Sequence, residues 1–211
     1  CRENRLFLRQ NVIDMYVSIE DKIRARIKRM KRGNVFFPEN FFDLGSETAC
    51  RKALERMSDK GEIMSVARGI YAYPEKSEMF GDVPPSMEQI ARAVAKRDHA
   101  RIIPTGQYAA HVLGFTTQIP LQVTYLTDGM PRKIRIGKRS LRFNKTAPKN
   151  LSARGENTAL IIQGLKAVGK ENVTEEMKMK VKALLEKESL ADVMHDMTLA
   201  PEWIRNIMKE A

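Results

Sequence analysis

Residues 18–74 constrain the fold more than any other part of the chain, because helix signals and chain breaks alternate there in a fixed order. Ser18 is a good N-cap, and isoleucines four residues apart, followed by Met30, give the first predicted helix one apolar face. Gly33 is expected to stop this helix. Residues 35–37 are short and apolar, a pattern typical of an extended segment.

A second and a third helix are predicted directly after this segment. Pro38 suits the first turn of a short helix, and Gly45 makes the turn that follows it. Ser46 is a good N-cap for a helix over 46–60, which Gly61 ends. The inner face of this third helix is predicted to consist of Cys50, Ala53, Leu54 and Met57, and its outer side carries Thr48, Arg51, Lys52 and Arg56.

Residues 63–66 and 69–73 alternate like two strands around a bend at 67–69. The whole order is helix, short helix, turn, helix and hairpin, which is that of a winged helix-turn-helix. Such a module places its third helix in a DNA groove, and a basic outer side agrees with that role. The alternative is a protein-binding or dimerisation unit whose basic side is only solvated.

The sequence after residue 75 predicts a second domain. Residues 76–85 have the composition of a linker, and residues from 156 onward are helical in pattern. Between them, strand patterns over 121–143 indicate an antiparallel meander of about three strands. The predicted fold class is α+β, with an N-terminal extension at 1–14, a winged helix-turn-helix at 15–75, a linker at 76–85 and an α+β domain with a helical C-terminal region at 86–211.

The positive charge is concentrated in the middle of the chain, although the whole sequence has a net charge of +11. Residues 1–80 have 16 Lys and Arg against 12 Asp and Glu, residues 81–155 have 13 against 4, and residues 156–211 have 8 against 10. A basic excess favours polyanionic partners through phosphate neutralisation, but it does not by itself specify a base sequence.

Residues 129–155 contain no acidic side chain. Side chains two residues apart share one face of a strand, so Lys133 and Arg135 are expected to point together, away from the neighbouring isoleucines. Solubilising surfaces normally mix both signs, so the absence of carboxylates favours a surface that binds nucleic acid or another partner. An ordinary solvated face is the alternative. The predicted basic patch comprises Arg132, Lys133, Arg135, Lys138, Arg139 and Arg142.

The sequence predicts no catalytic residue, metal site or cofactor. The three histidines, His99, His111 and His195, have no carboxylate or second histidine at a useful ligand spacing. The glycines Gly33, Gly45 and Gly61 are isolated, so no glycine-rich phosphate loop is present. We therefore expect that the protein is not an enzyme.

The cysteine content and hydropathy bear on the cellular compartment. Cys1 and Cys50 are too few for a disulfide framework or a cysteine metal site, and Cys50 is expected to be a small buried side chain. No apolar run reaches the roughly 18 residues that a membrane span needs, and no secretory signal is recognisable. We therefore expect a cytoplasmic protein with no membrane partner.

Two stretches of the chain resemble the AbiEi-type antitoxins of bacterial abortive-infection toxin–antitoxin operons. Residues 36–74 are similar to the N-terminal winged helix of that family, above all in the run Ala-Arg-Gly-Ile-Tyr-Ala-Tyr-Pro at 67–74. Residues 104–120, with Pro-Thr-Gly, Leu-Gly-Phe and Gln-Ile-Pro, resemble the opening of its C-terminal domain. The likeness covers about residues 18–155.

The resemblance implies a DNA-binding autorepressor. In this family the winged helix binds repeats in the operon promoter, and the C-terminal domain is needed to neutralise a nucleotidyltransferase-like toxin, in several systems without a stable complex. The implied DNA-contacting residues are Ser46, Thr48, Arg51, Lys52 and Arg56 on the third helix and Arg68 and Tyr71 on the wing. Promoter DNA and the toxin are the implied partners.

The charge distribution keeps a second interpretation open. The N-terminal module is only modestly basic, while the basic excess lies at 129–155. The chain is therefore also compatible with an RNA- or protein-binding module that uses its basic middle domain, with the winged helix serving dimerisation.

Overall fold

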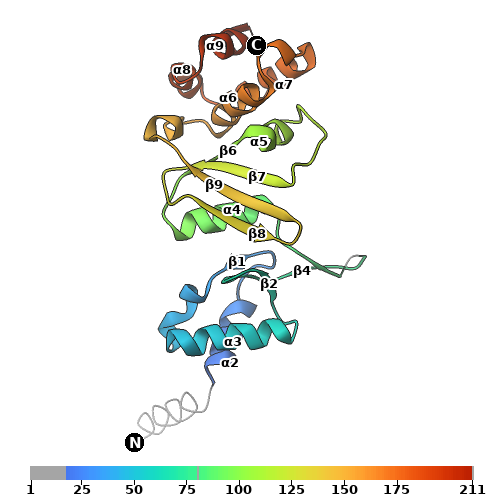
Figure 1. Ribbon diagram of the computed structural model, residues 1–211, viewed down its shortest axis with the longest axis vertical. Helices are drawn as coiled ribbons and strands as arrows, with labels where there is room; N and C mark the ends of the chain where they lie inside the picture. Colours follow the sequence, from blue (N-terminus) through green and yellow to red (C-terminus); the bar gives the residue numbers. More distant parts are fainter. Residues whose placement is uncertain (1–17, 80, 211) are drawn as a thin grey trace, which may run out of the picture. The chain divides into compact units, whose positions relative to one another are not determined.

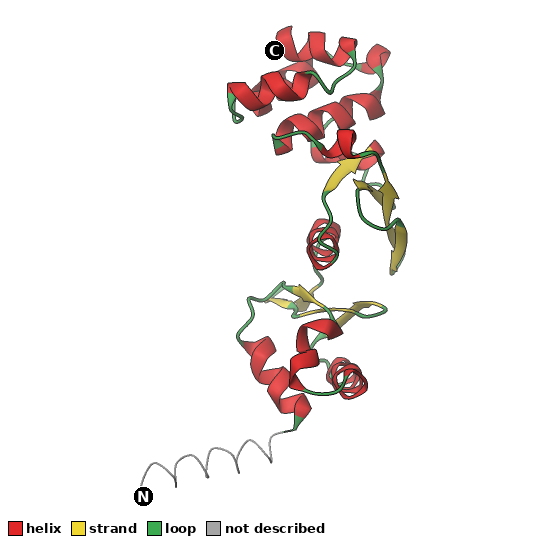
Figure 2. Cartoon of the chain, turned by 90° about the vertical axis from the view of Figure 1, so that its left-hand side faces the viewer, coloured by secondary structure: helices red, strands yellow, loops and turns green. Residues whose placement is uncertain are grey.

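The computed structural model describes residues 18–79 and 81–210, which form a mixed α+β protein and confirm the predicted fold class (Figure 1). The helices and strands divide into two compact units, one that ends at Ala93 and one that begins at Val94 (Figure 2). This boundary falls inside helix α4 (Met87–Arg97). The extension predicted at 1–14 lies outside the described residues.

The first unit has the predicted order of helix, short helix, helix and hairpin. Its elements are α2 (Ile19–Lys28), β1 (Val35–Phe36), the 3-10 helix η1 (Pro38–Leu44), α3 (Glu47–Asp59), β2 (Met64–Ala67), β3 (Ile70–Ala72), β4 (Glu75–Ser77) and β5 (Gly81–Val83). Strands β1, β3 and β2 form an antiparallel sheet in that order, with Phe36 opposite Tyr71.

The core of the first unit lies between α2, α3, η1 and this sheet. It comprises Ile23, Ile27, Phe36, Phe41, Cys50, Ala53, Leu54, Met57, Ile63 and Tyr71. The predicted inner face of the third helix is thereby confirmed. Cys50 is fully buried, its thiol donates to the Phe41 carbonyl over 3.1 Å, and burial raises its pKa. Gly45 permits close packing, because a Cβ there would lie 2.5 Å from Ile19 Cδ1.

Two local features of the first unit differ from the sequence prediction. Helix α2 ends at Lys28, before Gly33, which instead adopts a positive φ of 85° and donates its N–H to Tyr73 O over 2.7 Å. The predicted linker at 76–85 contains most of an antiparallel hairpin, in which Lys76 lies opposite Asp82. The linker prediction rested on amino-acid composition, which does not indicate cross-strand pairing.

The second unit contains one sheet and a helical C-terminal region. Its elements after α4 are β6 (Ile102–Thr105), α5 (Gly106–Val112), β7 (Gln122–Thr127), β8 (Arg132–Ile136), β9 (Arg139–Lys145), η2 (Pro148–Leu151), α6 (Glu156–Val168), η3 (Lys170–Asn172), α7 (Glu175–Leu185), α8 (Leu190–Met197) and α9 (Glu202–Glu210).

The sheet of the second unit corrects the predicted antiparallel meander. Its strand order is β6-β7-β9-β8, and β7 pairs with β9 in parallel. Leu141 and Phe143 of β9 are buried, whereas Lys133 and Arg135 of β8 are exposed. Strand β9 occupies an inner position, and β8 takes the edge, where the exposed charges of Lys133 and Arg135 oppose further strand pairing. Strand β6, which lies outside the predicted strand region of 121–143, pairs antiparallel with β7.

The helical region is packed around α6. Its core includes Ile161 and Leu165 of α6 together with apolar residues of α5, α7, α8 and α9, and Trp203 packs against this core. Helices α5 and α6 approach closely at Gly164, because a Cβ at that position would overlap the Leu113 side chain. The N-terminus of α6 is bound by a residue distant in sequence, Asp196 of α8.

Asp196 is fully buried, and its carboxylate lies within hydrogen-bond distance of polar groups from four residues. The backbone N–H groups of Arg154 and Gly155 donate over 2.9 Å each, and the Thr158 hydroxyl donates over 2.5 Å. The ring of His195 lies 2.8 Å away through Nδ1. Burial acts to raise the pKa of Asp196, but the hydrogen bonds from Thr158, His195 and the backbone outweigh it, so the pKa lies below its usual range.

Candidate nucleic-acid interface

The outer side of α3 presents the polar residues that the sequence predicted there. Ser46 is the N-cap, and its hydroxyl accepts from the Ala49 N–H over 3.3 Å. Thr48 and Lys52 are exposed. The predicted residues Ser46, Thr48, Arg51, Lys52 and Arg56 thus lie at the start and along the exposed side of one helix.

Arg51 is positioned by an aromatic ring more than by charge. Its guanidinium carbon lies 5.4 Å from the centroid of the Phe42 ring, a cation–π distance. The carboxylates of Glu39 and Glu47 lie 4.0 and 3.8 Å away, beyond hydrogen-bond range. The terminal nitrogens of Arg51 can therefore reach an external acceptor without breaking a close ion pair.

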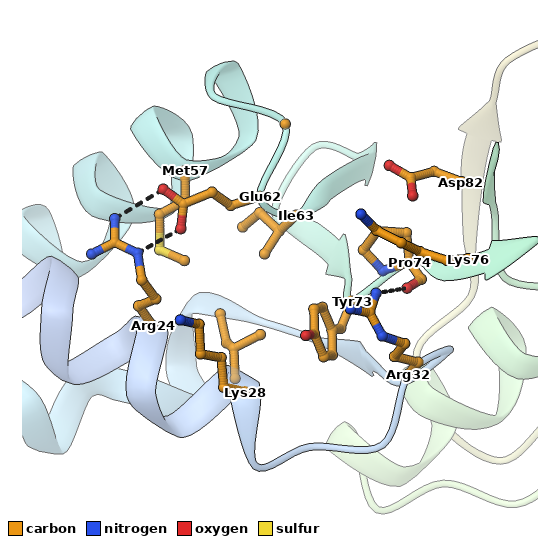
Figure 3. A pocket seen from close by; sticks show the side chains of 12 residues that line it. Arg24, Lys28, Arg32, Met57, Glu62, Ile63, Tyr73, Pro74, Lys76 and Asp82 are labelled. Atoms are coloured by element: carbon orange, nitrogen blue, oxygen red, sulfur yellow. Dashed lines mark hydrogen bonds and ion pairs between the residues drawn. The ribbon is translucent and has the colours of Figure 1, made fainter.

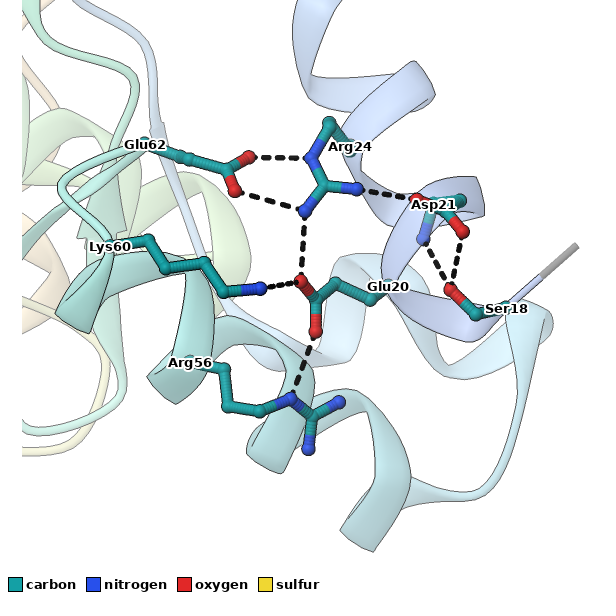
Figure 4. Close-up of polar contacts among 7 residues, drawn as sticks. All are labelled: Ser18, Glu20, Asp21, Arg24, Arg56, Lys60 and Glu62. Carbon is teal, nitrogen blue, oxygen red and sulfur yellow. Dashed lines mark hydrogen bonds and ion pairs between the residues drawn. The ribbon is translucent and has the colours of Figure 1, made fainter.

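Arg56 belongs to a network centred on Glu20 of α2 (Figure 4). The Glu20 carboxylate accepts from Arg56 Nε over 2.9 Å, from Lys60 Nζ over 2.6 Å and from Arg24 over 2.8 Å. Arg24 also donates twice to Glu62, over 2.6 and 2.9 Å. Because Glu20 engages only Nε of Arg56, the two terminal nitrogens point away from it (Figure 4). Local sequence patterns did not predict this network, because its hydrogen-bonded pairs are up to 40 positions apart.

Glu20 should stabilise the first unit above acidic pH. Hydrogen bonds from Lys60, then Arg56, lower its pKa from 4.5 to about 2. A depressed pKa contributes stability above pH 4.5, which is lost as the pH falls toward 2. We expect Glu20→Gln to lower the free energy of unfolding at pH 7 by about 1–2 kcal/mol. This value is smaller than the pKa shift alone implies, because Arg56 and Lys60 are half exposed and solvent screens their interaction with Glu20. Urea denaturation from pH 7 to pH 2.5 measures this difference, which should shrink with pH. Glu55→Gln is the matched control, and a difference independent of pH would contradict the prediction.

The two predicted wing residues, Arg68 and Tyr71, differ in exposure. Arg68 is exposed at the turn between β2 and β3, where Gly69 supplies the positive φ of 70°. Tyr71, which the resemblance places at the DNA, is only 7% exposed, and its ring stacks on Phe36 at a centroid distance of 6.3 Å. Burial raises the pKa of Tyr71. Its assignment as a DNA contact is therefore corrected, since β3 turns its side chain into the core.

A second basic surface lies on strands β8 and β9. Lys133 stands directly opposite Arg142, and Arg135 stands opposite Ser140. All three basic side chains are exposed. Like charges directly opposite each other on a sheet are unfavourable, so a bound anion would relieve this pair. We call Lys133, Arg135 and Arg142 the basic sheet face.

The basic sheet face continues into a shallow hollow. The hollow has a volume of about 480 Å³ and is lined by Lys133, Arg135, Lys138, Arg139 and Ser140. Arg139 is partly buried, and its Nε has no hydrogen-bond partner within the described residues. Four cationic side chains and one hydroxyl around one concavity form an arrangement suited to phosphate.

Arg132 does not belong to this face. It lies opposite Phe143 in the register, on the other side of β8, and its guanidinium pairs with Asp98. The predicted basic patch is therefore divided between the two faces of the sheet. The alternation of the strand separated Lys133 and Arg135 from Arg132, although the prediction grouped all three.

Two kinds of feature are absent from the described residues, a cluster of metal ligands and a membrane-spanning helix. Within 18–79 and 81–210, no group of three or more His, Cys, Asp or Glu side chains is arranged to hold a metal ion. No helix in the same ranges is long and apolar enough to cross a membrane.

Comparisons with known proteins relate the chain to a family and to one fold. Residues 22–193 match the model of DUF6088, described as a family of unknown function. No curated protein matches the sequence. The structure is similar to the crystal structure of the RV2827C protein from Mycobacterium tuberculosis, with a TM-score of 0.50 and 13% sequence identity, over 90% of this chain and 76% of that chain. At this identity the similarity concerns the fold alone.

Proposed function

The chain belongs to the DUF6088 family, a family of unknown function, and we propose that it is a DNA-binding antitoxin that represses its own operon. The observation that carries the proposal is α3, which buries one complete face while exposing Thr48, Arg51 and Lys52 along the other. In helix-turn-helix proteins this helix enters the major groove, where an arginine can bind guanine through two hydrogen bonds.

The neighbouring contacts support a role for α3 in binding. Arg51 rests on Phe42, and the carboxylates of Glu39 and Glu47 lie beyond hydrogen-bond range, so Arg51 breaks no hydrogen bond to them when it binds an external acceptor. Arg56 is held through Nε alone, which leaves its terminal nitrogens for a phosphate. Arg68 on the turn of the hairpin is exposed and can reach a flanking phosphate.

The antitoxin part of the proposal is supported by the resemblance of residues 36–74 and 104–120 to AbiEi-type antitoxins. On this basis the partners are promoter DNA and a nucleotidyltransferase-like toxin, and the chain acts in the cytoplasm without catalysis or a cofactor. Co-expression tests this part: the chain should relieve growth arrest caused by the toxin gene of its own operon. Unrelieved arrest, with the chain present in folded form, would remove neutralisation from the proposal.

Arg51→Ala with Lys52→Ala is expected to weaken binding to the DNA upstream of the operon by about 10–100-fold. The reason is that loss of one bidentate base contact costs about 1–3 kcal/mol, and that contact also selects the base. Fluorescence anisotropy with promoter and scrambled duplexes measures both affinity and preference. Lys182→Ala with Lys187→Ala carries the same change in charge and should bind normally. Unchanged promoter affinity in the α3 variant would reject the assignment of α3 as the recognition helix.

The charge distribution favours a second candidate function. The basic sheet face and its hollow lie in the second unit, where residues 81–155 carry the excess of 13 basic over 4 acidic side chains. This distribution suits an RNA- or protein-binding module in which the winged helix serves dimerisation. Loss of RNA binding, but not of promoter binding, on substitution of the basic sheet face would favour this function.

A further inference from the structure

The first unit contains a groove that the proposed DNA contacts do not use. The groove has a volume of about 420 Å³ and lies between α2, the turn after α3, and the segment from Tyr73 to the β4–β5 hairpin (Figure 3). Volumes of about 300–1,000 Å³ are typical of small-molecule sites. Thr48, Arg51 and Lys52 of α3 do not line it.

The charges around the groove are unbalanced. Arg24 and Glu62, at one end, satisfy each other through two hydrogen bonds of 2.6 and 2.9 Å. The remaining charged residues that line it are three cations, Lys28, Arg32 and Lys76, and one carboxylate, Asp82. Among the described residues, no carboxylate lies within ion-pair distance of the three cations. The groove therefore has an uncompensated positive charge.

The cation at one end is held in place. The Arg32 guanidinium carbon lies 4.6 Å from the centroid of the Tyr73 ring, and Nη1 donates to the Pro74 carbonyl over 3.1 Å. Stacking and this hydrogen bond fix the guanidinium plane while its other N–H groups stay available. Figure 3 shows Arg32, Tyr73, Pro74 and Lys76 together at this end. Such a preorganised arginine suits a planar oxyanion.

The rest of the groove is apolar at its base. Ile27, Met57 and Ile63 line it and belong to the core, so their positions are fixed by packing. Figure 3 shows Lys28 extending from α2 on the side of Met57, between the cationic end and the Arg24–Glu62 pair. A ligand with a flat apolar body could lie along this base while its charged end meets Arg32 and Lys76.

We propose that this groove binds a small organic oxyanion, an apolar or aromatic body whose carboxylate or phosphate meets Arg32 and Lys76, while Lys28 adds positive charge along the groove. The fixed guanidinium of Arg32 and the two lysines account for the preference for an anion, and the residues Met57, Ile63 and Tyr73 account for the body. The site is distinct from the proposed DNA-contacting side of α3, and its occupancy does not depend on DNA binding.

The test is an NMR titration of the full chain without DNA, observing methionine and isoleucine methyl groups. The probes are 2-naphthoate, 2-naphthyl phosphate, neutral 2-naphthalenemethanol and acetate. We expect both naphthyl anions to shift the methyl signals of Met57 and Ile63 and to bind at least 10-fold tighter than the neutral compound or acetate. Tighter binding of the phosphate than of the carboxylate would identify the natural ligand as an organic phosphate, and the reverse order a carboxylic acid.

Charge variants make the test specific for the groove. Lys28→Gln with Lys76→Gln should weaken 2-naphthoate binding at least 10-fold, whereas Lys170→Gln with Lys182→Gln carries the same charge change elsewhere and should have no effect. Asp82→Asn removes the single unpaired carboxylate and should tighten binding several-fold. Equal binding of the neutral compound, or unchanged affinity in both groove variants, would overturn the proposal. A failure of promoter binding would leave this result unaffected.

Discussion

Asp196→Ala is expected to destabilise the second unit by about 3–5 kcal/mol, a large fraction of the stability of a small domain. The substitution leaves the N–H groups of Arg154 and Gly155 without their buried acceptor, and the Thr158 hydroxyl keeps only the Gly155 carbonyl, 3.0 Å away. Each unsatisfied buried group costs about 1–3 kcal/mol. Urea denaturation of the full chain, monitored by the fluorescence of the single tryptophan Trp203, measures the decrease in the free energy of unfolding of the second unit.

The pH dependence of the stability difference distinguishes loss of the Asp196 hydrogen bonds from loss of packing. The pKa of Asp196 is depressed in the folded protein, so its contribution is complete above the ordinary carboxyl pKa of 3.8 and is lost as the pH falls below that value. The difference between wild type and Asp196→Ala should therefore narrow under acid conditions. Glu171→Ala removes an exposed carboxylate from the same unit and should change stability by less than about 0.5 kcal/mol. A similarly small effect at Asp196 would contradict the capping role.

Features set by local sequence were predictable, because each was encoded within about one turn or one strand. The inner face of α3 followed from the helical repeat of Cys50, Ala53, Leu54 and Met57, and Ser46 was recognisable as an N-cap. The helical pattern from residue 156 onward begins at the observed start of α6 (Glu156–Val168). Exposure of Lys133 and Arg135 followed from strand alternation.

Features set by long-range pairing were not predictable. The order β6-β7-β9-β8 includes a parallel pairing of β7 with β9, whereas chain order suggested an antiparallel meander. The Glu20 network joins α2 to the end of α3 across up to 40 positions, and Asp196 joins α8 to the start of α6. The family resemblance placed Tyr71 at the DNA, whereas Ile70, Tyr71 and Ala72 of β3 are all buried. The predicted DNA contacts that the structure exposes are therefore those on α3 and Arg68.

Replacing Lys133, Arg135 and Arg142 with Gln is expected to reduce the salt dependence of nucleic-acid binding while leaving promoter preference intact. Each phosphate contact contributes about 0.9 to the slope of log K against log salt, so three lost contacts should lower it by about 2–3 and weaken binding by roughly 100-fold at 0.1 M salt. Phosphate contacts position the protein and carry no base sequence, so the ratio of promoter to scrambled affinity should not change.

The geometry of the basic sheet face explains why the three residues should act together. Lys133 and Arg142 are direct cross-strand neighbours, and Lys133 and Arg135 are two residues apart on one strand, about 7 Å, which is comparable to the spacing of successive phosphates. Lys170→Gln, Lys182→Gln and Lys187→Gln together provide the same charge change on another surface, and anisotropy titrations from 50 to 300 mM salt compare the two. Equal slopes in the two triple variants would make the basic sheet face an ordinary solvated surface. A selective decrease, together with unchanged preference from α3, would assign sequence reading to the first unit and phosphate binding to the second.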